Sequence, residues 1–158
     1  DPLRTIFKKI TKKKIIKKVL TINKFYKNFL KKKAFIAMTG INPHCETKEK
    51  FNEEKKIITP AINFLRKKKI KIDGPFPADT IFLKQNLKKY NVIIGMYHDQ
   101  VLTPMKTIYG FNAINITLGL PFVRISPGHG PNEKMIGKNL SNPLSLIQTL
   151  NFINKFDN

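Results

Sequence analysis

Two of the three histidines in this chain stand where an apolar run ends. "AFIAMTG", residues 34–40, leads into "INPHCE" with His44, and "NVIIGMY", residues 91–97, leads directly into the pair His98–Asp99. An imidazole can bind a divalent metal, and it can transfer protons near neutral pH. The two histidines are therefore candidate ligands of one shared metal. Two unrelated loop histidines are the alternative, because side chains this far apart in sequence form no diagnostic motif.

Other side chains near these positions have two interpretations each. Asp99 could orient a metal ligand or act as an acid–base group, or it could cap a following helix. Cys45 could be a thiolate ligand or a small buried side chain. His129 lies in "SPGHGPN", a loop that allows close backbone approach to a ligand, or that forms only a tight turn.

Three polar residues lie within or beside apolar segments: Lys106, Asn115 and Arg124. Cationic and amide side chains in such places suit a pocket for an anionic substrate. Surface exposure would explain Lys106 equally well. Arg124 lies inside "PFVRIS", and we expect it to be buried with a partner, since a strand rarely buries an unpaired arginine.

The elements that position these residues alternate along the chain. Apolar spacing and capping residues predict helices at 11–33, 52–69, 78–90, after Asp99 and at 142–156. Thr11 and Asn142 are the expected caps, and Pro60 is a possible kink. Short apolar runs predict strands at 34–40, 70–74, 91–97, 113–120 and 121–126. The alternation predicts an α/β fold with a mostly parallel sheet, in which ligands bind beyond the carboxyl ends of the strands.

Composition narrows the class of protein. With 158 residues, 41% hydrophobic content and no long apolar run, the chain is about one globular domain without a membrane helix. A single cysteine is compatible with the cytoplasm, which is the expected location. The net charge of +20 raises nucleic acid as a partner. Only three of the 30 basic residues are arginine, however, and lysine runs on helices are better explained as solvated faces.

Five motifs occur together in one order: "GINPHCE", "DGPFPADT", "GMYHDQ", "INITLGLPFVR" and "SPGHG". In this order and spacing they resemble the 4-hydroxythreonine-4-phosphate dehydrogenase (PdxA) family, and "DPLRTIFKKIT" also resembles a family segment. The resemblance implies a three-layer α/β/α fold like that of isocitrate and isopropylmalate dehydrogenases. It implies a homodimer whose metal site is shared between subunits.

The implied activity is oxidation of 4-phosphooxy-L-threonine by NAD or NADP, followed by decarboxylation to 3-amino-2-oxopropyl phosphate, a precursor of pyridoxal phosphate. By motif match, His44 and His98 are two of three ligands of a divalent metal such as zinc, magnesium or cobalt. Lys106, Asn115 and Arg124 match substrate-binding positions. The same resemblance assigns catalytic roles to Asp79 and Asp99 and a cofactor contact to His129.

The match covers the C-terminal half of the family pattern. Residues 1–158 are therefore expected to be the C-terminal portion of such a dehydrogenase, with the N-terminal half and the third metal histidine absent, and inactive alone. Gly128 and Pro131 depart from the family's "DHGTA", which affects cofactor contacts from this loop. Two alternatives stay open: a related dehydrogenase for another phosphorylated or acidic hydroxy compound, and a basic nucleic-acid-binding module.

Overall fold

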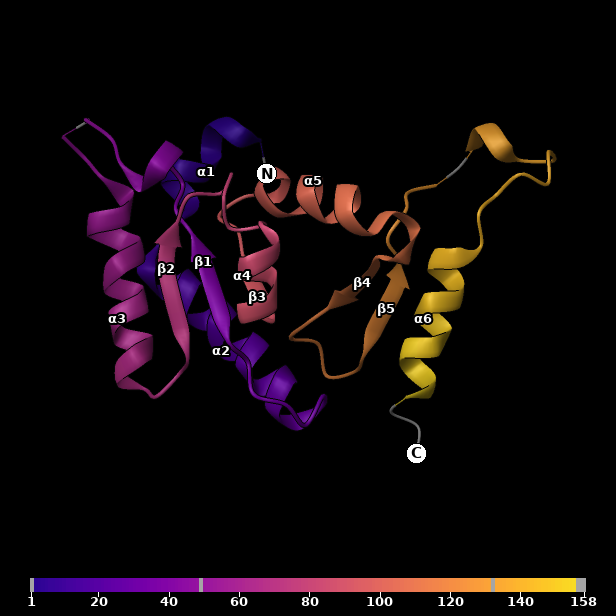
Figure 1. Ribbon diagram of the computed structural model, residues 1–158, viewed down its shortest axis with the longest axis horizontal. Helices are drawn as coiled ribbons and strands as arrows, with labels where there is room; N and C mark the ends of the chain where they lie inside the picture. Colours follow the sequence, from indigo (N-terminus) through magenta and orange to yellow (C-terminus); the bar gives the residue numbers. More distant parts are fainter. Residues whose placement is uncertain (1, 49, 132, 156–158) are drawn as a thin grey trace. The chain divides into compact units, whose positions relative to one another are not determined.

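The computed structural model describes residues 2–48, 50–131 and 133–155, which divide into two compact units, 1–102 and 103–158 (Figure 1). The boundary falls within α5 (His98–Tyr109). The other elements of the first unit are α1 (Leu3–Lys9), α2 (Lys12–Asn28), β1 (Ile36–Thr39), η1 (Pro43–Cys45), η2 (Glu54–Ile58), α3 (Thr59–Lys67), β2 (Ile72–Phe76), α4 (Lys84–Lys89) and β3 (Val92–Ile94). No helix in the described part of the chain is long and apolar enough to cross a membrane.

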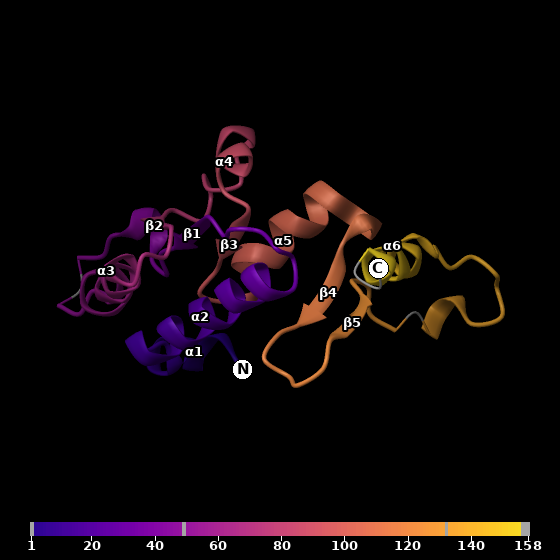
Figure 2. The same cartoon turned by 90° about the horizontal axis from the view of Figure 1, so that it is seen from below.

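A three-stranded parallel sheet, in the order β2-β1-β3, forms the centre of the first unit. Helices α1, α2 and α3 lie on one face of this sheet and α4 on the other (Figures 1 and 2). Alternation along β1 explains the two cores: Ile36 and Met38 pack with α2 and α3, while Ala37 packs with Ile81 and Tyr90 on the opposite face. The predicted three-layer α/β arrangement is confirmed here.

The predicted starts of the first two long helices are confirmed. The Thr11 side chain accepts a hydrogen bond from Lys14 N at 3.3 Å, and Asn52 Oδ1 accepts one from Lys55 N at 2.8 Å. Helix α2 ends at Asn28, before the predicted residue 33, and Lys31 follows with a positive φ of 54°. Pro60 lies in the first turn of α3, and the irregularity of this helical segment is the π-helical turn η2 directly before it.

The prediction of one helix over residues 78–90 is wrong for its first half. Only Lys84–Lys89 is α-helical, and the preceding residues form turns. Ile81 is buried in the smaller core, and Asn86 Nδ2 donates to Thr80 O at 2.9 Å. Burial of Ile81 and these local hydrogen bonds favour the turn over a further helical turn.

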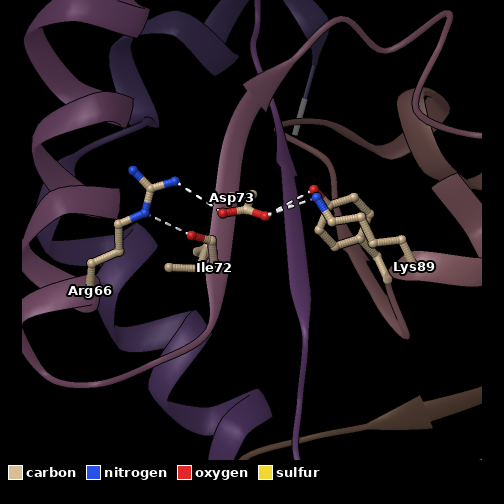
Figure 3. A network of polar contacts seen from close by, with 5 residues as sticks. Arg66, Ile72, Asp73 and Lys89 are labelled. Atoms are coloured by element: carbon tan, nitrogen blue, oxygen red, sulfur yellow. Dashed lines mark hydrogen bonds and ion pairs between the residues drawn. The ribbon is translucent and has the colours of Figure 1, made fainter.

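Asp73 on β2 joins the two helical layers through polar contacts (Figure 3). Arg66 of α3 donates from Nη2 to Asp73 Oδ1 at 3.1 Å and from Nε to Ile72 O at 2.9 Å. On the other side, the Tyr90 hydroxyl donates to Asp73 Oδ2 at 2.9 Å and Lys89 Nζ lies 3.5 Å from the same atom. Burial alone would raise the pKa of Asp73, but these donors outweigh it and hold the pKa below its ordinary value.

The second unit is built on an antiparallel ribbon. After α5 its elements are η3 (Gly110–Asn112), β4 (Ile114–Thr117), β5 (Arg124–Pro127), η4 (Glu133–Met135) and α6 (Leu144–Asn154). β4 and β5 pair antiparallel, with Asn115 opposite Ser126, because the connection between them is too short for a parallel crossover. Asn142 Oδ1 caps α6 by accepting from Leu144 N at 2.9 Å, as predicted. Residue 156, the predicted end of this helix, lies outside the described residues.

Ser145 links α6 to both strands of the ribbon. Its hydroxyl donates to Ala113 O at 2.6 Å and accepts from Gly128 N at 2.8 Å. The residue is 1% exposed, so both hydrogen bonds are shielded from water. One buried hydroxyl therefore sets the position of α6 against the ends of β4 and β5.

Candidate functional site

His44 lies in a loop that a buried carboxylate holds in place. The loop follows the carboxyl end of β1, and His44 and Cys45 have positive φ angles of 54° and 61°, a costly conformation for residues other than glycine. Glu54, only 2% exposed, accepts from Ile41 N and Asn42 N at 2.8 Å each. Its second oxygen accepts from Asn42 Nδ2 at 2.9 Å. These bonds hold the backbone before the strained pair, while His44 itself is exposed.

Hydrogen bonding keeps Glu54 charged in this setting. Burial alone would raise the pKa of its carboxyl, but the donors on Asn42 and Ile41 outweigh burial and lower the pKa below its ordinary value. For Cys45 the balance is the opposite, since burial and the nearby charge of Glu54 raise the pKa of the thiol. Cys45 is thus a neutral thiol packed beside Gly40, where an added Cβ would lie 2.7 Å from its Sγ. This favours the interpretation of Cys45 as a packing residue.

His98 is the first residue of α5 and follows the carboxyl end of β3. Its Nδ1 lies 2.6 Å from Asp99 Oδ1, and both side chains are largely exposed. A carboxylate at Nδ1 favours the tautomer that leaves Nε2 free as a metal ligand. Because β1 and β3 are parallel neighbours, the two histidines follow the same edge of the sheet, as predicted.

A cavity of about 250 Å³ opens beside the His44 loop. Asp79 contributes to its wall together with His44, Tyr97 and Gln100. The structure thus brings Asp79, which follows β2, to the same cavity as His44. Within the described ranges, no group of three or more histidine, cysteine or acidic side chains is placed to hold a metal. Exposed imidazoles, one of them oriented by a carboxylate, are chemically suited to a divalent cation, which would need further ligands.

Lys106 and His129 share a second cavity, which lies wholly within the second unit. The cavity has a volume of about 310 Å³, and Phe111, Ser145 and three glycines, Gly110, Gly128 and Gly130, complete its wall. His129 Nδ1 lies 3.0 Å from Gly130 O, and the ring centroids of Phe111 and His129 are 6.4 Å apart. The cavity therefore combines an ammonium group, an aromatic ring and exposed loop backbone, which suits a planar or anionic ligand.

Asn115 and Arg124 lie on one face of the β4–β5 ribbon. Arg124 Nη1 donates to Thr117 Oγ1 at 3.0 Å, and Asn115 Nδ2 donates to Ser126 Oγ at 3.4 Å. The prediction that Arg124 is buried is wrong, since both Arg124 and Asn115 are exposed. A two-stranded ribbon leaves one face open to solvent, and alternation puts all four polar side chains on one face.

Three residues of this architecture were not singled out from the sequence: Glu54, Gln100 and Ser145. In the sequence, Glu54 is only a residue near the start of the predicted helix at 52–69, and the proximity of Gln100 to the His98–Asp99 pair is its only signal. For Ser145 no sequence signal exists. Each of the three acts on backbone far away in sequence, which local patterns do not show.

Comparison with known proteins gives one consistent result. The family model described as "Pyridoxal phosphate biosynthetic protein PdxA" matches residues 1–153. The chain is 43% identical over 151 residues to a 4-hydroxythreonine-4-phosphate dehydrogenase of Sulfurihydrogenibium, a match that covers 94% of this chain and 46% of the relative. It is 46% identical over 116 residues to the protein of the same name from Bradyrhizobium diazoefficiens, covering 73% of this chain and 34% of that one.

Solved structures agree with this result. The crystal structure of 4-hydroxythreonine-4-phosphate dehydrogenase from Klebsiella pneumoniae superposes with a TM-score of 0.83 and 28% identity, covering 100% of this chain and 49% of that one. The matches to the Sulfurihydrogenibium and Klebsiella proteins extend over nearly all of this chain. The chain spans about half the length of each of these two relatives.

Proposed function

The chain belongs to the PdxA family of pyridoxal phosphate biosynthetic proteins, and we propose that it forms the metal- and substrate-binding portion of an NAD- or NADP-dependent 4-hydroxythreonine-4-phosphate dehydrogenase. The family predicted from the five motifs is thereby confirmed. The position of His44 and His98 after adjacent parallel strands is the single observation that carries the functional proposal.

In this proposal His44 and His98 hold a divalent cation, such as zinc, magnesium or cobalt, through their imidazole nitrogens. Asp99 orients the His98 ring through Nδ1, so that Nε2 is presented for binding. At least one further ligand comes from outside the described chain, since a catalytic site of this kind uses three protein ligands. A second subunit of the proposed homodimer is its source.

When bound, the cation supplies Lewis acidity toward the substrate hydroxyl and the product of decarboxylation, and the nicotinamide accepts a hydride. In the proposal, Asp79, which lines the cavity beside His44, takes the hydroxyl proton of 4-phosphooxy-L-threonine as C3 is oxidised to a ketone. Loss of carbon dioxide and uptake of a proton then give 3-amino-2-oxopropyl phosphate.

The second unit contributes the groups that bind negative charge. Lys106 and Arg124 neutralise the carboxylate and phosphate of the substrate, and Asn115 donates a further hydrogen bond. Thr117 and Ser126 support this by holding the Arg124 and Asn115 side chains at the surface of the ribbon. His129, in the second cavity with Phe111, is the proposed cofactor contact.

Homodimer formation is supported by the apolar surface of α6. Four side chains at helical spacing are between 38% and 52% exposed: Leu146, Ile147, Leu150 and Ile153. A contiguous apolar face of this kind is usually covered by another protein surface.

The proposal is tested by assaying NAD and NADP reduction with 4-phosphooxy-L-threonine. The chain is assayed alone and joined to the N-terminal portion of the Sulfurihydrogenibium relative, with and without a chelator. We expect turnover that depends on divalent metal and is abolished by His98→Ala, while the melting temperature of the variant is retained. A folded joined protein that is inactive, or a His98→Ala variant with unchanged turnover and metal affinity, would contradict the proposal.

A further inference from the structure

Gln100 links the two strand ends from which the candidate metal ligands project. Its Oε1 accepts from Thr39 Oγ1 at 2.9 Å and from Met96 N at 2.8 Å, and its Nε2 donates to Gly40 O at 2.8 Å. Thr39 is the last residue of β1 and Gly40 follows it, while Met96 lies in the turn after β3. One side chain thus joins the end of β1, the turn after β3 and the first turn of α5.

The orientation of this amide is determined by its partners. A backbone N–H can only donate and a backbone C=O can only accept, so Met96 N selects the oxygen and Gly40 O selects the nitrogen. Gln100 is 8% exposed and Thr39 is 0% exposed, which makes these bonds costly to lose. The arrangement needs a side chain with an acceptor and a donor on the same terminal carbon.

The glycines at the two strand ends allow the close approach that this link requires. A Cβ at Gly95 would lie 2.7 Å from Val101 Cγ1 and 3.3 Å from Gln100 Cβ. A Cβ at Gly40 would lie 2.9 Å from Glu54 Oε1. Small residues therefore let α5 and the His44 loop approach the end of the sheet closely.

The candidate ligands themselves have little to hold them. His98 is exposed, and its only partner among the described residues is the neighbouring Asp99, which is equally exposed. His44 is exposed and has no hydrogen-bond partner in the part of the chain that the structure describes. Their separation is set by the backbone on which they stand, which Gln100 joins on the His98 side and Glu54 holds on the His44 side.

We propose that Gln100 is a positioning residue of the metal site, which sets the spacing of His44 and His98 by joining the carboxyl end of β1 to the start of α5. This inference rests on the proposed function, because it takes the two histidines as metal ligands. Gln100 also contributes to the wall of the cavity that contains His44 and Asp79, so it acts at the site itself.

The chain contains a matched control at the opposite end of the same strands. Asn91 Oδ1 accepts from Phe35 N at 2.7 Å and its Nδ2 donates to Lys33 O at 2.9 Å. Asn91 thus joins the approach to β1 to the approach to β3 with the same amide chemistry, but away from the histidines. A purely structural role would make the two amides alike in their effect on metal binding.

The experiment measures cobalt affinity by calorimetric titration, and thermal stability, for the chain joined to the N-terminal portion of the Sulfurihydrogenibium relative and for variants of this joined protein. Gln100→Met keeps the side-chain length but removes the hydrogen bonds, and we expect it to weaken cobalt binding about tenfold. Asn91→Leu is expected to lower the melting temperature without changing cobalt affinity. Thr39→Ser, which keeps the hydroxyl donor, should bind like the unmodified joined protein, and Thr39→Val should weaken binding less than Gln100→Met does.

The outcomes separate the two proposals. Cobalt binding that is lost in His44→Ala but unchanged in Gln100→Met would overturn the positioning role and leave the proposed function standing. Equal losses of affinity in Gln100→Met and Asn91→Leu would also overturn it, because they would follow stability alone. If the joined protein shows no histidine-dependent cobalt binding, the metal site of the proposed function fails, and the inference fails with it.

Discussion

The two units of this chain use their apolar side chains in different ways. In the first unit, both faces of the parallel sheet are covered, and residues such as Val19, Met38 and Leu65 are completely buried. In the described part of the second unit, only Ser145 and Thr149 are buried, and both are polar. Many large apolar residues there are exposed instead, Phe122 at 63% and Leu150 at 52% among them.

This difference shows that the candidate residues of the first unit and those of the second unit have different kinds of structural support. The histidines stand on a sheet with its own core, so their backbone is held by burial and by buried hydrogen bonds. Of the candidate substrate-binding side chains, Asn115 and Arg124 stand on a two-stranded ribbon, which is at best marginally stable unless another surface covers it, and Lys106 stands on α5. The geometry of Lys106, Asn115 and Arg124 should therefore depend on what packs against the second unit.

The same substitution in the two units gives the largest expected contrast. Leu65→Ala removes a completely buried side chain of α3 and should lower the free energy of unfolding by about 2–5 kcal/mol. Leu150→Ala, on the exposed face of α6, should change it by less than about 0.5 kcal/mol in the monomer. Urea unfolding at low and high protein concentration measures the change in free energy of unfolding for both variants. Equal changes at low concentration would contradict the expected difference between the two units.

Ser145→Ala tests the polar link of the second unit. Without the hydroxyl, Gly128 N and Ala113 O lose a shielded partner, and we expect a local destabilisation of about 1–3 kcal/mol. Amide hydrogen exchange at Gly128 should accelerate accordingly. Ser141→Ala, at an exposed serine before α6, is the control and should leave this exchange unchanged.

Glu54→Gln tests whether the buried carboxylate of Glu54 stabilises the His44 loop. The substitution removes the negative charge of the Glu54 carboxylate, which strengthens three hydrogen bonds. We therefore expect the free energy of unfolding to fall by about 1–2 kcal/mol at neutral pH. Glu53→Gln alters the neighbouring carboxylate, which contacts Asn42 Nδ2 at 3.1 Å, and should cost less. A larger loss in Glu53→Gln would mean that the buried carboxylate does not hold the loop.

The smallest expected effect concerns pH and the contacts of Asp73. Its pKa is lowered in the folded chain, so its contribution is fully present above the ordinary aspartate pKa of about 4 and is lost as pH falls through the lower folded-state value. Asp73→Asn should thus cost about 1 kcal/mol or less at neutral pH. The difference between the variant and the unmodified chain should vanish in strong acid, as measured by urea unfolding. A constant difference across pH would assign the effect to packing instead.

Local patterns in the sequence predicted most of the elements correctly. Thr11, Asn52 and Asn142 act on backbone within three residues of themselves, so their capping roles can be recognised without a fold. The placement of His44 and His98 after strands followed from apolar runs of the right length. The helix over 78–90 failed because Ile81 is taken into the core of the sheet, an effect that propensity does not include.

The sequence by itself therefore determined the family, the α/β class and the identity of the candidate ligands, because motif order and hydrophobic alternation are properties of the chain. Tertiary structure alone decided that Glu54 and Gln100 hold the strand ends, that β4 and β5 pair antiparallel and that Arg124 is exposed. It also decided that no apolar side chain is buried in the described part of the second unit. The physical reason is that buried hydrogen bonds and burial itself depend on which distant segments meet, and Thr39 and Gln100, 61 residues apart, meet only in the folded chain.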